Sequence, residues 1–292
     1  MIRVRVSSLP FQGLRFLVVS ACAILAGLPL PPVARADDLP VLFDARERLP
    51  RPDLSGLLRV RFLTTTDFPP FNFADQTGRL SGFHIDLARA ICAELGIEAK
   101  CQIQALPYDE LETALDAGQG DAVLAGVAVS EDLRDRFAFT RPYLFLPARF
   151  ARNTKASLDG DDPAALFGRP VGVVSGTAHE AMLKAFFPGM KATGFPDRET
   201  MLGELKSGKI DAVFADSLQL SFWVAGQASA DCCALFGRAY VSERFLGEGL
   251  TIMLRKDDPQ QLTAAFDSAL AALSRSGRLQ EIYLRYFPYG LF

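Results

Sequence analysis

The chain has 292 residues, of which 49% are hydrophobic and 22% are charged, and its formal net charge is −3. This composition excludes a disordered or fibrous protein and is enough for one large or two medium α/β lobes. The acidic balance argues against nucleic acid as a partner. His84 and His179 are the only histidines, and no second closely spaced Cys/His cluster is present. We therefore expect neither a zinc site nor a cofactor.

The first residues form a separate segment. Basic residues precede an apolar run over residues 16–30, and Ala34-Arg35-Ala36 follows it. The pattern predicts a secretory signal peptide over residues 1–36, removed to leave a chain that begins at Asp37. The run is shorter than the roughly 20 residues of a spanning helix. Lipidation at Cys22, after Val19-Ser20-Ala21, is the alternative. In either case we expect a periplasmic protein.

Export to an oxidising compartment permits disulfides. Cys92 lies near the end of a predicted helix, and Cys101 lies in the strand that follows. This arrangement predicts a Cys92–Cys101 disulfide, with two buried free thiols as the alternative. Cys232 and Cys233 are adjacent in a predicted loop, and the sequence leaves their state open.

The predicted elements alternate between strand and helix after a polar extension over residues 37–57. The first series is strand 58–64, a Pro- and Phe-rich loop 65–75, helix 82–95, strand 101–105, helix 109–117 and strand 121–125. The second series, after Arg149, is strand 171–174, helix 178–186, helix 199–207 and strand 210–214. Strand 250–255 and helices 259–274 and 278–286 follow. This alternation is typical of mostly parallel sheets covered by helices.

One pattern occurs twice in the chain, as Leu115-x-x-Gly118-x-x-Asp121-Ala122-Val123-x-Ala125-Gly126 and as Leu205-x-x-Gly208-x-x-Asp211-Ala212-Val213-x-Ala215-Asp216. Each copy reads as the end of a helix, a glycine stop and a short buried strand. The repeat predicts two lobes, with Gly126 and Asp216 at opposite walls of a shared cleft. Asp121 and Asp211, which begin the strands, are expected only to end loops.

Several stretches of the chain resemble the exported solute-binding proteins of ABC importers, polar amino-acid family. They are Thr66-Asp67-Phe68-Pro69-Pro70-Phe71, Gly82-Phe83-His84-Ile85-Asp86-Leu87-Ala88, both Asp-Ala-Val strands, Phe139-Thr140, Val171-Gly172-Val173-Val174-Ser175-Gly176-Thr177 and Leu254-Arg255-Lys256. The resemblance covers about residues 58–292 and implies an α/β, two-lobed, periplasmic-binding-protein-like II fold. Lobe 1 would comprise residues 58–144 and 249–292, and lobe 2 residues 149–241, with a hinge of two crossing segments near 144–148 and 241–249.

The resemblance also implies a function. The chain would be a monomer without enzymatic activity that captures a small-molecule solute and delivers it to an inner-membrane ABC permease. Two other readings stay open, a cyclohexadienyl dehydratase-like enzyme and an accessory protein of a periplasmic quinoprotein dehydrogenase. The enzyme would need a cationic clamp for a substrate carboxylate.

The resemblance carries over to individual residues of the cleft. Phe68 matches the aromatic residue that stacks on the solute, Tyr108 matches the opposite wall, and Asp216 matches the carboxylate that holds an ammonium group. Asp216 also ends a buried strand, where ligands bind in open α/β sheets. Thr177 opens a helix whose first amides suit an anion or carbonyl, and His179 follows in its first turn. The alternatives are core packing for the aromatics, a plain helix cap for Thr177 and solvated side chains for His179 and Asp216.

One departure from the family pattern concerns the arginine that clamps the solute α-carboxylate. Its position is taken by Leu133, and two serine or threonine positions before it are Gly126 and Ala128. Arg134 is adjacent, but one helical residue turns a side chain by about 100°. Arg149 is the second possible substitute. We therefore expect an amine-bearing solute that lacks an α-carboxylate or that engages Arg134 or Arg149.

Overall fold

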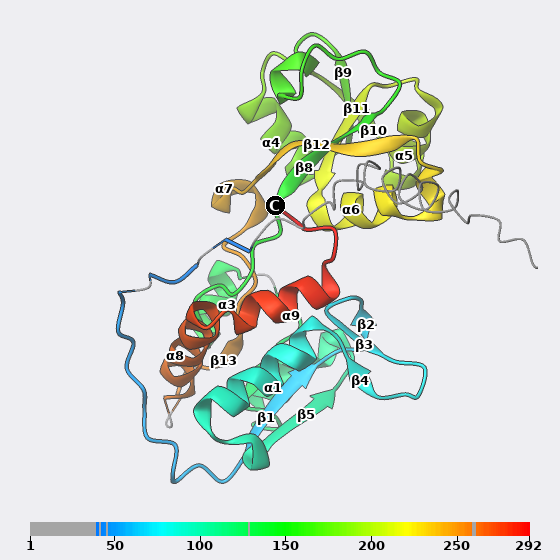
Figure 1. The fold of residues 1–292 in the computed structure, drawn as a ribbon. Helices are drawn as coiled ribbons and strands as arrows, with labels where there is room; N and C mark the ends of the chain where they lie inside the picture. Colours follow the sequence, from blue (N-terminus) through cyan, green and yellow to red (C-terminus); the bar gives the residue numbers. More distant parts are fainter. Residues whose placement is uncertain (1–38, 41, 45, 128, 259–260) are drawn as a thin grey trace, which may run out of the picture. The chain divides into compact units, whose positions relative to one another are not determined.

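The computed structural model describes residues 39–292 except 41, 45, 128, 259 and 260 (Figure 1). The expected signal peptide, the alternative lipidation site Cys22 and the site candidate Ala128 lie outside the described residues. No helix within the described ranges is long and apolar enough to cross a membrane.

The first sheet has the order β5-β1-β6-β13-β7. Strands β1 (Val60–Thr64), β5 (Cys101–Ala105) and β6 (Ala122–Val123) run parallel. Strand β13 (Met253–Arg255) lies antiparallel to β6 and to β7 (Phe137–Phe139). The chain therefore returns to the first sheet after it has built the second.

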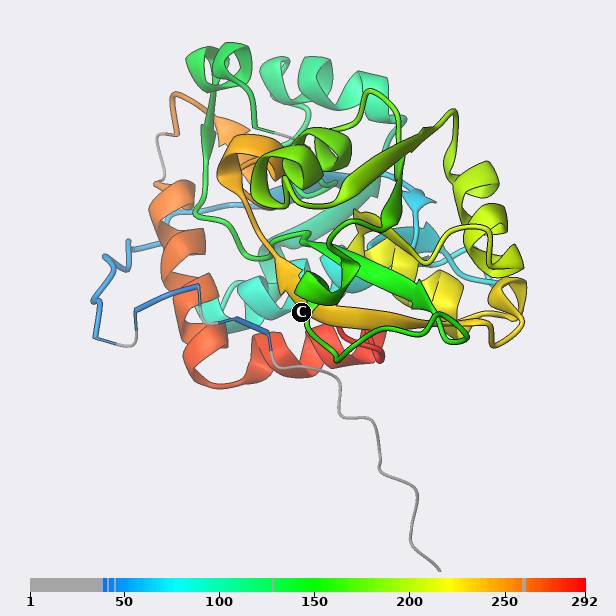
Figure 2. The ribbon, with the colours of Figure 1, turned by 90° about the horizontal axis from the view of Figure 1, so that it is seen from above.

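Helices cover both faces of the first sheet. Helices α1 (Phe83–Leu95), α8 (Leu262–Arg275) and α9 (Arg278–Tyr286) share one core with β1, and α2 (Leu111–Asp116) packs on the other face (Figures 1 and 2). Helix α1 forms because its apolar residues recur four apart and Gly96 ends it in the left-handed conformation, with φ 68°. This is the helix that the sequence predicts over residues 82–95.

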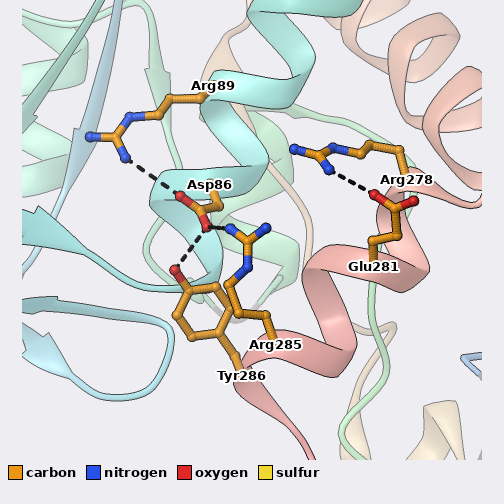
Figure 3. A network of polar contacts seen from close by, with 6 residues as sticks. All are labelled: Asp86, Arg89, Arg278, Glu281, Arg285 and Tyr286. Atoms are coloured by element: carbon orange, nitrogen blue, oxygen red, sulfur yellow. Dashed lines mark hydrogen bonds and ion pairs between the residues drawn. The ribbon is translucent and has the colours of Figure 1, made fainter.

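A polar contact fixes α1 against α9 (Figure 3). Asp86 of α1 accepts a hydrogen bond of 2.9 Å from the Tyr286 hydroxyl and pairs with the guanidinium of Arg285. Arg89 approaches the second carboxylate oxygen at 3.4 Å. The aspartate of the Gly82–Ala88 stretch thus positions helices of the first lobe.

The second sheet has the order β10-β9-β11-β8-β12. Strands β9 (Pro170–Val174), β10 (Lys191–Phe195) and β11 (Ala212–Asp216) run parallel, and β8 (Ala148–Asn153) lies antiparallel to β11 and to β12 (Cys233–Tyr240). Helix α4 (Ala178–Phe186) packs on one face, and α5 (Arg198–Ser207) and α6 (Ser217–Ala225) pack on the other. The second sheet thus repeats the parallel core of the first.

The two copies of the sequence repeat occupy equivalent places in the two sheets. Asp121, before β6, accepts from the backbone N–H of Arg61 at 2.8 Å and forms an ion pair of 3.2 Å with its guanidinium. Asp211, before β11, forms an ion pair of 2.8 Å with Arg169, which precedes β9. The expectation that these aspartates only end loops is wrong, because each ties its strand to the neighbouring parallel strand.

Several elements were not expected from the sequence. The loop predicted over residues 65–75 folds with residues 80–81 into a small sheet of β2 (Asp67–Phe68), β3 (Asn72–Ala74) and β4 (Leu80–Ser81). The remaining short elements are α3 (Glu131–Arg136), α7 (Glu243–Leu246) and the 3₁₀ turns η2 (Glu98–Lys100), η3 (Tyr108–Glu110), η4 (Pro163–Leu166) and η5 (Gln227–Ser229).

Two chain segments join the sheets, one between β7 and β8 and one between β12 and β13. They meet where Leu250 donates a backbone hydrogen bond of 2.7 Å to Leu144. A third contact involves residues 290–292. The hydroxyl of Ser217 in α6 donates to the Leu291 carbonyl, and that of Ser221 donates to the Gly290 carbonyl at 3.1 Å. The segment after α9 is therefore hydrogen-bonded to the second lobe.

Both cysteine pairs form disulfides. Cys92 in α1 is bonded to Cys101 in β5, so the end of the helix is linked to the next strand. Cys232 and Cys233 form a vicinal disulfide at the start of β12. The sequence had left the state of this second pair open.

Candidate functional site

The first-lobe part of the site centres on Phe68 and Gly126. Phe68 in β2 stacks on Phe71, with ring centroids 4.7 Å apart. Gly126 follows β6 and has φ 75°, and a β-carbon there would lie 2.8 Å from Cε1 of Phe68. Both the left-handed backbone and the aromatic ring therefore require glycine at this position. The packing of Phe68 therefore leaves no room for the serine or threonine that the family resemblance predicts at this position.

A buried polar network lies beneath these aromatic rings. The two ring nitrogens of His84 contact Asn72 Oδ1 at 2.6 Å and the Tyr143 hydroxyl at 2.8 Å. Asn72 in turn donates to the hydroxyl of Thr65 at 2.5 Å. Burial lowers the pKa of His84 to about 3, so its imidazole is neutral. The network connects the Phe68 loop to Tyr143, which precedes the crossing-segment contact at Leu144.

Sequence reasoning weighed His84 only as a possible metal ligand and missed this network. No cluster of three metal-ligating side chains occurs within the described part of the chain. The available signal was a histidine inside the Gly82–Ala88 stretch, at a position that faces the core once α1 forms.

In the second lobe, Asp216 ends β11 and caps α6. Its carboxylate accepts a hydrogen bond of 2.9 Å from the backbone N–H of Gln219. Burial raises the pKa of Asp216, and the Gln219 N–H and the nearby His179 oppose this effect. A partly buried carboxylate of this kind is stabilised in its charged form by a cationic group.

Thr177 and His179 lie at the start of α4 in the same lobe. The hydroxyl of Thr177 donates to the Val174 carbonyl at 2.7 Å and accepts from the Glu180 N–H at 3.3 Å, so it acts as the helix cap. Burial lowers the pKa of His179, and Asp216 raises it. The His179 ring lies 6.4 Å from that of Phe214 in β11, the strand that Asp216 ends, so His179 and Asp216 belong to the same part of the second lobe.

Three other candidates have contacts of a different kind. Tyr108 lies in η3 with 53% of its surface exposed. The guanidinium of Arg134 forms an ion pair with Glu248. That of Arg149 donates to the Phe292 carbonyl at 3.0 Å and to the Gly237 carbonyl at 3.3 Å. Both arginines that were expected to replace the missing clamp are thus already bound to protein groups.

A cavity of about 530 Å³ adjoins Phe68. The helices α5 and α6 supply the side chains on its other side, including Leu218, Phe222, Trp223, Gln219 and Arg198. Sequence reasoning missed Arg198 and Trp223, because their approach to Phe68 depends on how α5 and α6 pack on the second sheet.

Comparison with known proteins then identifies the family. Residues 60–289 match the family model of bacterial extracellular solute-binding proteins, family 3. The chain belongs to this family. The family consists of solute-binding proteins, and the enzyme alternative finds no support in these comparisons.

Two relatives and one solved structure illustrate the match. The L-arginine-binding protein of Pseudomonas aeruginosa is 29% identical over 235 residues, which cover 80% of this chain and 89% of that protein. The L-cystine-binding protein of Escherichia coli K12 is 28% identical over 271 residues, which cover 92% and 93%. The L-cystine solute receptor of Neisseria gonorrhoeae, in an unliganded open conformation, aligns with a TM-score of 0.67 at 20% identity over 78% of this chain and 92% of that one. The expected two-lobed, type II periplasmic-binding fold is thereby confirmed.

Proposed function

We propose that this family 3 protein is an extracytoplasmic receptor that captures an amine-bearing solute between its lobes and delivers it to an ABC permease. The observation that carries the proposal is the pairing of two half-sites. The first lobe presents the partly buried ring of Phe68, and the second presents the partly buried carboxylate of Asp216. An aromatic face and a carboxylate together suit a small organic cation.

The relatives support an amino acid or a related amine as the solute class. Their names include arginine-binding, lysine/arginine/ornithine-binding and L-cystine-binding proteins. Every solute in those names carries an ammonium group. Export through cleavage after Ala36, a monomeric state and lobes that meet at residues 144–148 and 241–249 complete the proposal.

A thermal-shift screen against amines, amino acids and small carboxylic acids tests this function. A solute at about 100 times its dissociation constant adds roughly 2.7 kcal/mol to the free energy of unfolding. Asp216→Asn should reduce the shift that an amine produces by at least half. Asp211→Asn is the matched control, because Asp211 lies at the other end of β11 and pairs with Arg169. A protein that no compound in the screen stabilises would contradict the proposal.

A further inference from the structure

The cavity beside Phe68 combines apolar walls with a single charge. Phe68, Leu218, Phe222 and Trp223 supply aromatic and aliphatic surface, and Gln219 supplies an amide. Arg198 is the only charged residue among those that line this cavity in the described part of the chain. A ligand enclosed here would meet apolar contacts on most sides and a guanidinium at one point.

The guanidinium of Arg198 is available to a ligand. No hydrogen bond or ion pair joins its side chain to another described residue. Asp197, the residue directly before it, does not pair with it. Asp197 instead caps α5, accepting from the N–H of Thr200 at 2.7 Å and from its hydroxyl at 2.9 Å. Arg198 therefore keeps its donors free.

The position of Arg198 in its helix is also unfavourable for the helix itself. Arg198 is the first residue of α5. The N-terminus of a helix carries a partial positive charge, and a cation placed there is destabilising. The same field adds to the attraction of this site for an anion. A cation that does not stabilise its own helix and has no partner in the fold is suited to binding a ligand.

The charge of Arg198 reaches the other part of the site. It acts on the carboxylate of Asp216, whose pKa it lowers against the larger effect of burial. Asp216 also holds the backbone N–H of Gln219, and Gln219 lines the cavity together with Arg198. The second lobe therefore presents a negative group beside the cavity and a positive group at its wall. An ammonium and a carboxylate on one small molecule could engage both groups.

We infer that Arg198 replaces the missing carboxylate clamp and that the second lobe alone holds both charges of a zwitterionic solute whose apolar or aromatic side chain lies against Phe68 and Trp223. The inference rests on the proposed function and names its solute class. The clamp position Leu133 packs with the first-lobe core, and Arg134 and Arg149 are engaged elsewhere. The cation that binds the solute carboxylate is thus supplied by the second lobe, where the family pattern has it in the first.

Three matched probes test this arrangement: L-phenylalanine, phenethylamine, which lacks its carboxylate, and 3-phenylpropionate, which lacks its amine. Trp223 is the only tryptophan of the chain, so its fluorescence reports directly on the occupied cavity. Calorimetry on the exported protein gives the affinities. We expect the wild type to bind L-phenylalanine at least tenfold more tightly than phenethylamine.

Arg198→Ala should remove this difference, because the affinity for L-phenylalanine should fall while that for phenethylamine stays the same. Arg198→Lys should restore part of the difference. Asp216→Asn should lower the affinity for L-phenylalanine and phenethylamine, which carry an amine, and leave the affinity for 3-phenylpropionate unchanged. Arg278→Ala, which removes an arginine paired with Glu281 on α9, is the control and should bind all three probes like the wild type. A thermal midpoint for each variant shows that it is folded.

Equal affinities of the wild type for L-phenylalanine and phenethylamine would overturn the inference, as would discrimination that survives in Arg198→Ala. Absence of binding by all three probes would also overturn the assigned solute class. In each case the proposed function stands if an amine from the wider screen binds in an Asp216-dependent manner. It fails together with the inference only if no solute binds.

Discussion

The ring of Phe68 lies so close to Gly126 that a β-carbon at residue 126 would be 2.8 Å from Cε1 of the ring. This contact couples the loop after β6 to the aromatic wall of the site. A side chain at residue 126 would displace Phe68 from the position in which it faces the cavity.

Gly126→Ala should therefore destabilise the protein and weaken solute binding. The left-handed backbone alone costs about 1 to 2 kcal/mol for a residue with a side chain, and the contact with Phe68 adds to it. Chemical denaturation measures the loss. Gly203→Ala is the control, since a β-carbon there meets nothing within 4 Å and the backbone is helical. If the steric explanation holds, Phe68→Ala should lower the free energy of unfolding less in the Gly126→Ala protein than in the wild type.

Asp216→Asn should weaken binding of an amine-bearing solute at least tenfold, which corresponds to about 1.4 kcal/mol. The unliganded protein should keep its stability. Asparagine caps a helix as well as aspartate does, and the change removes a carboxylate whose charge is disfavoured by burial. Calorimetry and denaturation measure the two effects. Unchanged affinity for the solute would remove Asp216 from the site.

The stability of the protein should fall as the pH is lowered from neutral. The pKa of His84 is about 3 in the folded protein, and that of an unfolded histidine is about 6.5. The folded state thus favours the neutral imidazole. The contribution of His84 to the free energy of unfolding is complete above about pH 6.5 and is lost as the pH falls towards 3. The loss reaches about 2 kcal/mol at pH 5.

Denaturation at a series of pH values tests this assignment. His84→Gln should flatten most of the slope between pH 6.5 and 5, whatever its effect on absolute stability. His179→Gln is the matched control, because His179 is the only other histidine of the chain. It should flatten the slope less. An unchanged slope in His84→Gln would show that other groups control the pH dependence.

Loss of the Cys92–Cys101 disulfide should cost about 2 to 3 kcal/mol, since the bond closes a short loop in the unfolded chain. The double variant with serine at both positions, measured by denaturation, gives this value. The matched variant at Cys232 and Cys233 should lose much less, because adjacent residues close almost no loop. Similar losses in both variants would contradict the loop-closure explanation. Peptide mapping without reductant identifies the bonds in the exported protein.

The sequence predicted those helices and strands that have a regular apolar spacing and a glycine stop, because these are local signals. Helix α1 and the strands after Gly118 and Gly208 follow from such patterns. Helix α6 was missed because it is apolar on several faces and so lacks a one-sided apolar spacing. It packs against β8, β11 and β12 of the second sheet. Strand β8 was missed because Arg149 and Arg152 interrupt its apolar residues, so it resembles a surface segment until its antiparallel partners are known.

The candidate site was predictable where a residue is fixed by the end of a strand, as for Asp216. It was not predictable where helix packing decides the position. Arg198 lies ten residues before Gly208, the glycine that ends α5, in a sequence with no distinctive pattern, and only the packing of α5 brings it to the cavity. Arg134 and Arg149 were reasonable substitutes by sequence, but their distant partners Glu248 and Phe292 could not be read from local spacing.

The ion pairs Arg61–Asp121 and Arg169–Asp211 mark equivalent ends of β6 and β11 in the two sheets. The strand orders of the two sheets correspond position by position, and β6 and β11 take the same place in them. At the opposite end of the aligned strands, one half has a glycine beneath an aromatic ring and the other has a carboxylate that caps a helix. One framework is thus used twice, with an uncharged contact surface in the first half and a charged one in the second, and specificity can change in either half while the shared framework is kept.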